Sequence, residues 1–154
     1  MTDLLSLCSF NAAYALAIDS DALEQWPAFF AEKCMYRITN VENEREGLPA
    51  GIVYADSRAM LDDRIAALRE ANIYERQRYR HLLGIPLVES ADAQGAVART
   101  PFMVARIMAT GETTLFASGE YRDRFTTAGG KLLLAERVAV CDSTVTDTLL
   151  ALPL

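Results

Sequence analysis

The first third of the chain has the hydrophobic spacing of amphipathic helices. Between residues 4 and 18, the residues that would share one helical face recur at intervals of three and four, the period of an α-helix packed along one side. A short second helix is predicted to begin near Asp21, because Glu24 follows it with the spacing of a capping box. A third is predicted over residues 57–72. The residues expected to face the core from these helices are Leu7, Phe10, Asn11, Tyr14, Ala17, Ile18, Leu23, Trp26, Phe30, Leu61, Ile65 and Leu68.

Alternating apolar and polar positions predict strands. One strand is expected at residues 33–39, between the helices, followed by a polar loop at 40–51 that contains two Gly and one Pro. From residue 78 onward the period is two, with Tyr79, His81 and Leu83 on one face and a bend at Gly84 and Pro86.

Three further strands complete the pattern. Residues 101–109 are apolar on both faces, residues 113–126 alternate, and residues 131–141 follow a hairpin turn at Gly129-Gly130. In the alternating strand, the residues expected to face inward are Leu115, Ala117, Tyr121 and Phe125.

Helices followed by a run of antiparallel strands are typical of the α+β class. The chain has 154 residues, which suits a single domain over 1–154. We expect N-terminal helices packed on a curved, mainly antiparallel sheet, which is the cone-shaped fold of nuclear transport factor 2 and ketosteroid isomerase.

Composition and charge narrow the possible functions. The net charge of −6 disfavours binding to a nucleic-acid backbone, and no apolar run reaches the length of a membrane-spanning helix. The N-terminal MTDLLSLCSFN carries an acidic residue where a signal peptide is basic. We therefore expect a cytoplasmic protein without nucleic-acid or membrane partners. Cys8, Cys34 and Cys141 are too far apart for a metal knuckle and are expected to be small buried hydrophobes.

The single histidine limits metal chemistry. A mononuclear iron site of the facial-triad type needs two His and a carboxylate, and a Rieske cluster needs two His and two Cys, but His81 is the only histidine in the sequence. Nucleotide-binding glycine motifs and a serine nucleophile elbow are absent as well. We expect no cofactor or metal on this chain.

Acid–base chemistry in a pocket of the cone is the enzymatic alternative. His81 would be the general base of a free-standing isomerase or dehydratase, although a lone histidine in a strand is usually structural and bonded to a carboxylate or the backbone. Glu120 and Asp123 have opposite parity on one strand, so at most one of them can face such a pocket. A small-ligand binding module is a further alternative. The candidate partners of His81 are Glu120, Asp123 and Asp142, and the candidate hydrogen-bond donors are Tyr14, Tyr36 and Tyr121.

Arginine is unusually abundant, with thirteen Arg against two Lys. Arginine is enriched at protein interfaces because its planar fork makes bidentate contacts. Arg69, Arg76, Arg78 and Arg80 fall within twelve residues. Three interpretations stay open at this point: a solvated face, an anion-binding pocket, or a docking surface for an acidic patch on another chain.

Several blocks of the sequence resemble a known family. They are DSDALEQWPAFFAEKCMYRIT (19–39), DSRAMLDDRIAALREANIY (56–74), YERQRYRHLLG (74–84), TPFMVARIMATGET (100–113), FASGEYRDRF (116–125) and ERVAVCDSTVTDTLLALPL (136–154). Together they are similar to the small (β) subunits of Rieske-type aromatic-ring-hydroxylating dioxygenases, and within that family to the terephthalate-like branch. The resemblance extends from about residue 9 to residue 154.

This resemblance implies a non-catalytic, structural subunit with the cone fold and without redox centres. The Rieske [2Fe-2S] cluster and a mononuclear non-haem iron are expected on a large (α) subunit, with electrons from NAD(P)H arriving through a separate reductase. The family implies a trimer of αβ pairs with contacts between small subunits. The residues that we expect in subunit contacts are Arg76, Arg78, Arg80, His81, Leu152 and Leu154.

Overall fold

The computed structural model describes residues 2–47, 51–71, 75–143 and 152–154. Tyr74 and most of the apolar tail (144–151) lie outside the described residues. The helices are α1 (Leu4–Asp19), the 3₁₀ helix η1 (Leu23–Phe29), α2 (Val41–Arg45) and α3 (Arg58–Ala71). The strands are β1 (Phe30–Asn40), β2 (Val53–Ala55), β3 (Gln77–Leu83), β4 (Leu87–Ala91), β5 (Gly95–Met108), β6 (Thr113–Ala128) and β7 (Lys131–Cys141).

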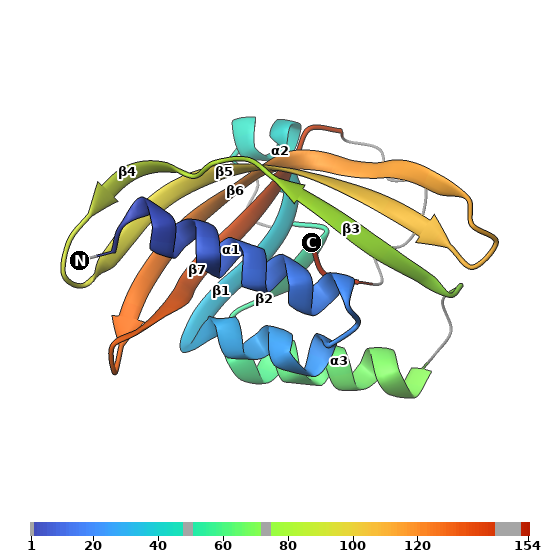
Figure 1. The fold of residues 1–154 in the computed structure, drawn as a ribbon, viewed down its shortest axis with the longest axis horizontal. Coiled ribbons are helices and arrows are strands. Elements are labelled where there is room, and N and C mark those ends of the chain that lie inside the picture. The colour runs from blue at the N-terminus through green and yellow to red at the C-terminus, as the bar shows by residue number, and fades with distance from the viewer. Residues whose placement is uncertain (1, 48–50, 72–74, 144–151) are drawn as a thin grey trace.

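A single curved sheet wraps one side of the helical layer (Figure 1). Its strand order is β2-β1-β7-β6-β5-β3, with β4 also paired to β5. The β1–β7 pair is parallel and the other pairs are antiparallel. This is the predicted α+β cone with a mainly antiparallel sheet. We call the face toward α1, η1 and α3 the inner face, and the opposite one the outer face.

The predicted helical faces form the core of the cone. Leu7, Asn11, Tyr14, Ala17 and Ile18 of α1 are buried as expected, and Phe10 is half-buried. From η1 and the start of β1, Leu23, Trp26 and Phe30 are fully buried, and α3 buries Leu61 and Ile65. These side chains pack against the inner residues of the sheet.

The turn predicted at Gly129-Gly130 and the bend predicted near Gly84 are both found in the structure. Gly129 and Gly130 both have positive φ, at 58° and 76°, which a two-residue hairpin turn of type I′ requires. Gly84 directly follows β3, and a Cβ atom there would lie 3.0 Å from the ring of Pro101. The chain bends at this point, so that β3 and β4 pair with different parts of β5.

Three local predictions are wrong, each because a tertiary or side-chain contact prevails. Asp21 and Glu24 do not cap η1; both bind Arg69 of α3. The predicted loop at 40–51 contains the short helix α2, which the side chain of Asn40 caps by accepting from the Asn43 N–H. Leu115 is exposed, because a bulge in the β5–β6 register turns Phe116 inward in its place.

Candidate functional site

The outer face carries an apolar band along β3, β5 and β6. Leu82 lies opposite Met103, and Ala105 lies opposite Leu115, so the four side chains form one continuous strip. Leu82 is 68% exposed, Met103 46% and Leu115 62%. Apolar side chains that are exposed side by side on a sheet often mark a surface that another chain covers. We call these four residues the outer apolar band.

The predicted arginines adjoin this band. Arg76, Arg78 and Arg80 are all exposed, and the register places Arg78 opposite Ile107 and Arg80 opposite Ala105. Within the described part of the chain, no carboxylate lies within 4 Å of Arg76 or Arg78, and Arg80 has only Asp19 at 4.0 Å.

Other arginines on the surface already have carboxylate partners. On the outer face, Arg99 and Arg122 share Glu120, at 2.6 and 2.9 Å. Burial favours the neutral acid, but the two arginine hydrogen bonds outweigh it and hold the pKa of Glu120 below its usual value. Two further pairs are Arg37–Glu44 and Arg124–Glu136. Arg76 and Arg78, in contrast to these paired arginines, have no carboxylate within 4 Å among the described residues, and Arg80 has only the distant Asp19.

A groove of about 500 Å³ runs between α1 and the bend after β3. Its lining includes Leu16, Arg80, Leu82 and Ile85. Leu16 is 60% exposed and Ile85 is 74% exposed. The groove thus extends the outer apolar band toward α1 and has an arginine on its wall.

His81 is bound to Asp19, the last residue of α1. The ring Nδ1 lies 2.6 Å from one carboxylate oxygen, and the backbone N–H of His81 donates to the other at 2.8 Å. Both side chains are almost fully buried. Because β3 is an edge strand, this carboxylate both satisfies a backbone donor of that edge and fixes α1 against it. The sequence interpretation of His81 as a structural histidine bonded to a carboxylate agrees with this geometry.

The proposed catalytic partners of His81 do not meet it. Asp123 binds Arg137, Glu120 binds Arg99 and Arg122, and Asp142 accepts a hydrogen bond from Ser118. The Nε2 atom of His81 is buried and has no hydrogen-bond partner among the described residues. A general base must reach its substrate through such an atom, so this arrangement does not support His81 as a base.

Leu152 and Leu154 also differ from the prediction. Their side chains are 4% and 0% exposed and belong to the core of the chain itself. A main-chain oxygen of Leu154 accepts hydrogen bonds from the hydroxyls of Tyr14 and Tyr36. The two leucines and His81 therefore present no side-chain surface to a partner, and the expected contact set is reduced to Arg76, Arg78 and Arg80.

A buried ion pair lies at the centre of the inner face. Arg137 of β7 and Asp123 of β6 are directly opposite, with two contacts of 2.8 Å, and both side chains are 0% exposed. Asn11 accepts a further bond from Arg137 at 2.6 Å. Burial by itself would lower the pKa of Arg137. The neighbouring Asp123 outweighs that effect and raises the pKa of Arg137, so the guanidinium is charged.

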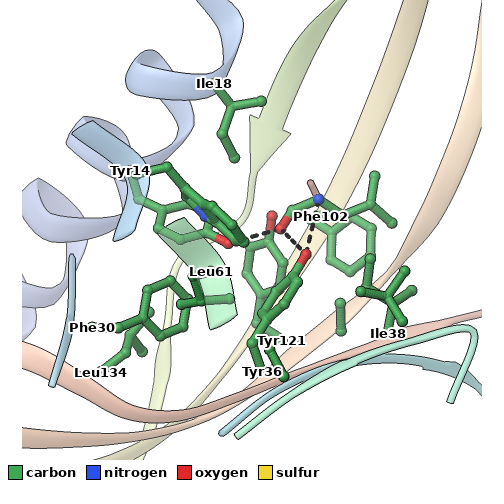
Figure 2. Close-up of a cluster of buried hydrophobic side chains, with 14 of the residues drawn as sticks. Tyr14, Ile18, Phe30, Tyr36, Ile38, Leu61, Phe102, Tyr121 and Leu134 are labelled. Atoms are coloured by element: carbon green, nitrogen blue, oxygen red, sulfur yellow. Dashed lines mark hydrogen bonds between the residues drawn. The ribbon is translucent and has the colours of Figure 1, made fainter. Parts of the chain in front are cut away.

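Aromatic side chains enclose this pair. The guanidinium carbon of Arg137 lies 4.2 Å from the ring centroid of Tyr14 and 3.9 Å from that of Tyr121, which are cation–π distances. Figure 2 shows Tyr14, Tyr36 and Tyr121 pointing toward one another in the buried cluster. Burial raises the pKa of all three hydroxyls, so they are neutral donors. The centre of the inner face is thus filled by the Arg137–Asp123 pair and the aromatic rings around it.

The cysteines lie in apolar surroundings. Cys34 and Cys141 are buried, Cys8 is half-buried, and all three thiols are free. Burial raises the pKa of the Cys141 thiol to about 11. Over the described ranges, no three His, Cys, Asp or Glu side chains are placed together to hold a metal ion. None of the helices described has the length and apolar character needed to cross a membrane.

Comparison with known proteins identifies the family. The family model described as "Ring hydroxylating beta subunit" matches residues 13–148. The chain belongs to this family. Two β subunits of the terminal oxygenase component of terephthalate 1,2-dioxygenase from Comamonas sp. are each 68% identical to it over 154 residues, which is all of this chain and all of each relative.

A solved structure agrees with the fold and with the family assignment of this chain. The crystal structure of a β subunit assigned to an aromatic-ring-hydroxylating dioxygenase of Novosphingobium aromaticivorans DSM 12444 is 38% identical to this chain. It superposes with a TM-score of 0.89 over 98% of this chain and 96% of its own. The expected cone fold and the membership among ring-hydroxylating β subunits are both confirmed.

Proposed function

We propose that this chain is the non-catalytic β subunit of the oxygenase component of a terephthalate dioxygenase, folded as one cone domain over residues 1–154. The observation that carries the proposal is the 68% identity to two terephthalate dioxygenase β subunits, which extends over the full length of both partners in the comparison. In this role the chain takes part in aromatic-compound catabolism as a component of an oxidoreductase complex.

The proposal assigns the redox chemistry to an α subunit. A Rieske cluster and a mononuclear iron would reside there, with electrons from NAD(P)H supplied by a separate reductase; use of that cofactor supports a cytoplasmic location. On this chain the single histidine is occupied by Asp19, and Arg137 and Asp123 neutralise each other inside the core. These contacts support a structural role for the buried polar residues of this chain.

The surface proposed for the α subunit combines the outer apolar band with Arg76, Arg78 and Arg80. Exposed apolar area supplies the hydrophobic contribution to association. Arg76 and Arg78, which have no carboxylate within 4 Å among the described residues, and Arg80, which is 65% exposed beside Asp19, would bind acidic groups of a partner in bidentate fashion. A trimer of αβ pairs with contacts between β subunits is part of the same proposal.

Reconstitution tests the function. We expect the purified chain alone to show no terephthalate oxidation, and the chain co-expressed with a terephthalate dioxygenase α subunit to form a brown complex that oxidises terephthalate when the reductase and NADH are supplied. Omission of the chain should reduce the yield of folded, active α subunit. Normal assembly and activity of the α subunit without this chain would contradict the proposal.

His81→Asn separates this proposal from a free-standing isomerase or dehydratase. Asparagine keeps an N–H donor for Asp19 but cannot act as a base at neutral pH. The complex with His81→Asn should keep its activity within about twofold. If the chain alone catalysed isomerisation or dehydration, and His81→Asn abolished that activity, the alternative would be established. A saturable thermal shift without turnover would instead indicate a ligand-binding module.

A further inference from the structure

The groove between α1 and the bend after β3 opens on the surface at the edge of the sheet. β3 is the edge strand there, and α1 packs against it (Figure 1). The lining includes Cys8, Ala12 and Leu16 on the helix side, and Leu82, Ile85 and Pro86 on the other. Of these, Ala12, Leu16, Leu82 and Ile85 are exposed. The groove is therefore an apolar channel outside the packed interior of the cone.

The charge that this groove presents to a partner is positive. Among the Asp, His and Arg side chains that line it in the described part of the chain, Asp19 and His81 are almost fully buried, whereas Arg80 is 65% exposed. An incoming carboxylate would therefore meet the guanidinium of Arg80 and not the acid behind it. Guanidinium and carboxylate groups bind each other in bidentate fashion, so the groove suits an apolar segment that carries an acidic side chain.

The Asp19–His81 contact joins the two walls of the groove. Asp19 ends α1 and His81 lies in β3, and both residues belong to the lining. The carboxylate of Asp19 holds the backbone N–H of His81 at 2.8 Å and the ring Nδ1 at 2.6 Å. Because this contact is made within the chain itself, the groove is already formed before any partner binds, which lowers the cost of ordering the interface.

The groove is continuous with the surface proposed for the α subunit. Leu82 belongs both to the outer apolar band and to the lining of the groove, and Arg80 lies on the groove wall. A chain that covers the outer apolar band must therefore reach the mouth of the groove. A second copy of this chain in the groove would compete with the α subunit for Leu82 and Arg80.

We infer that a segment of the α subunit inserts aliphatic or aromatic side chains into this groove and places a carboxylate on Arg80. A volume of about 500 Å³ lies in the range of pockets that enclose a ligand, so it accommodates several side chains of one segment. The inference rests on the proposed function and extends it, because it makes α1 a part of the contact and assigns the Asp19–His81 pair the task of positioning the groove walls.

The first test fills the groove. Ala12 lines it, whereas Ala13, which is also exposed, lies outside its lining, so Ala12→Trp blocks the groove and Ala13→Trp is the matched control. Each variant, shown to be folded by circular dichroism, is co-expressed with the unmodified chain and a tagged α subunit, so that the two β chains compete. Relative to the soluble pool, Ala12→Trp should be depleted about tenfold in the purified complex, as the loss of a buried interface anchor implies. Ala13→Trp should be recovered within about twofold of the unmodified chain.

Recovery of the unmodified chain separates the inference from the proposed function. Its absence from the purified α subunit would contradict the proposed function itself. If the unmodified chain is recovered and Ala12→Trp competes equally with it, or if the two tryptophan variants are depleted alike, the inference is overturned and the proposed function stands.

The second test leaves the groove unmodified and decides the question if Ala12→Trp does not fold. Cys8 lines the groove and is half-buried, whereas Cys34 and Cys141 are buried. Alkylation of Cys8 by iodoacetamide, measured by mass spectrometry of this chain, should be about fivefold slower in the complex with the α subunit than in the chain alone, because a covered thiol is unreactive. A thiol introduced by Ala13→Cys should react at similar rates in both.

Two results of the alkylation experiment would overturn the inference. One is an equal rate for Cys8 in the complex and in the chain alone. The other is a slowing that appears without the α subunit as the concentration of the chain rises, which would place a second copy of this chain in the groove.

Discussion

The two faces of the sheet differ in the burial of their arginines and in the partners that these arginines have. On the inner face, Arg137 has Asp123, Asn11 and two tyrosine rings as partners and no exposure to solvent. On the outer face, Arg76 and Arg78 are exposed, with no carboxylate of the described residues within 4 Å, and a continuous apolar strip lies beside Arg78 and Arg80.

This difference separates stability from function. Buried polar groups that bind one another, such as Arg137 and Asp123, hold a fold in one arrangement. Exposed apolar groups beside exposed arginines contribute little to the isolated chain, yet they suit contact with a second protein. The comparison therefore assigns the stability of the cone to its inner face and its role as a subunit to its outer face.

The largest expected effect is at the buried ion pair. Asp123→Ala should lower the free energy of unfolding by about 3–5 kcal/mol, because it leaves the buried charge of Arg137 without compensation. Urea denaturation of the isolated chain measures this loss. Glu136→Ala, which removes the half-buried partner of the exposed Arg124, should cost no more than about 1 kcal/mol. Equal losses in the two variants would mean that burial does not distinguish the inner pair.

A smaller loss is expected at Tyr36. Tyr36→Phe removes the hydroxyl that donates to a main-chain oxygen of Leu154 and accepts from the Leu154 N–H, which should cost about 1–3 kcal/mol in thermal or urea unfolding. Tyr121→Phe is a matched control, since its hydroxyl is buried without a hydrogen-bond partner in the described part of the chain, and should change stability by less than about 0.5 kcal/mol. A reversed order would show that residues 152–154 are not held by the tyrosine hydroxyls.

The smallest effect concerns an exposed pair and depends on pH. The hydrogen bond from Arg69 holds the pKa of Glu24 below its usual value. Since the folded-state pKa is lowered, this stabilisation is present above the unfolded pKa and is lost as pH falls through the folded value. Glu24→Gln should thus be less stable than the unmodified chain at pH 7, by about 0.5 kcal/mol after solvent screening, and equally stable near pH 2. Stability curves from pH 2 to 7 measure the difference, and a gap that widens toward low pH would contradict the assignment.

Most of the fold follows from the hydrophobic pattern and the turn residues. The strand predicted at 131–141 and the Gly129-Gly130 turn coincide with β7 and its hairpin. The bulges could not be predicted. From the turn alone, Asp123 would lie opposite Glu136, two acids face to face. The register shift between Arg124 and Phe125 instead brings Arg137 opposite Asp123, which no local pattern reveals.

The candidate site was only partly predictable for a similar reason. Strand parity correctly placed His81 on the face opposite to Arg78 and Arg80, because period two determines faces, but the prediction that His81 lies in a subunit contact did not follow from parity. The partner of His81 was not foreseen, since Asp19 lies 62 residues away at the end of another element. Likewise, the apolar LLALPL stretch resembled an exposed contact segment, but its last residues bond to Tyr14 and Tyr36 of the same chain. The burial of His81 and of Leu154 is determined by side-chain contacts between residues far apart in the sequence.

The central claim is that the outer face contacts the α subunit, and charge reversal tests it most directly. Arg78→Glu with Arg80→Glu should leave the isolated chain folded, with a modest loss of stability where the new carboxylate at position 80 meets Asp19, yet strongly reduce co-purification of a co-expressed, tagged α subunit. Arg124→Glu, an exposed arginine farther along the same face whose partner is Glu136, is the matched control and should assemble normally. Unchanged recovery of the α subunit with the doubly reversed, folded chain would contradict the claim.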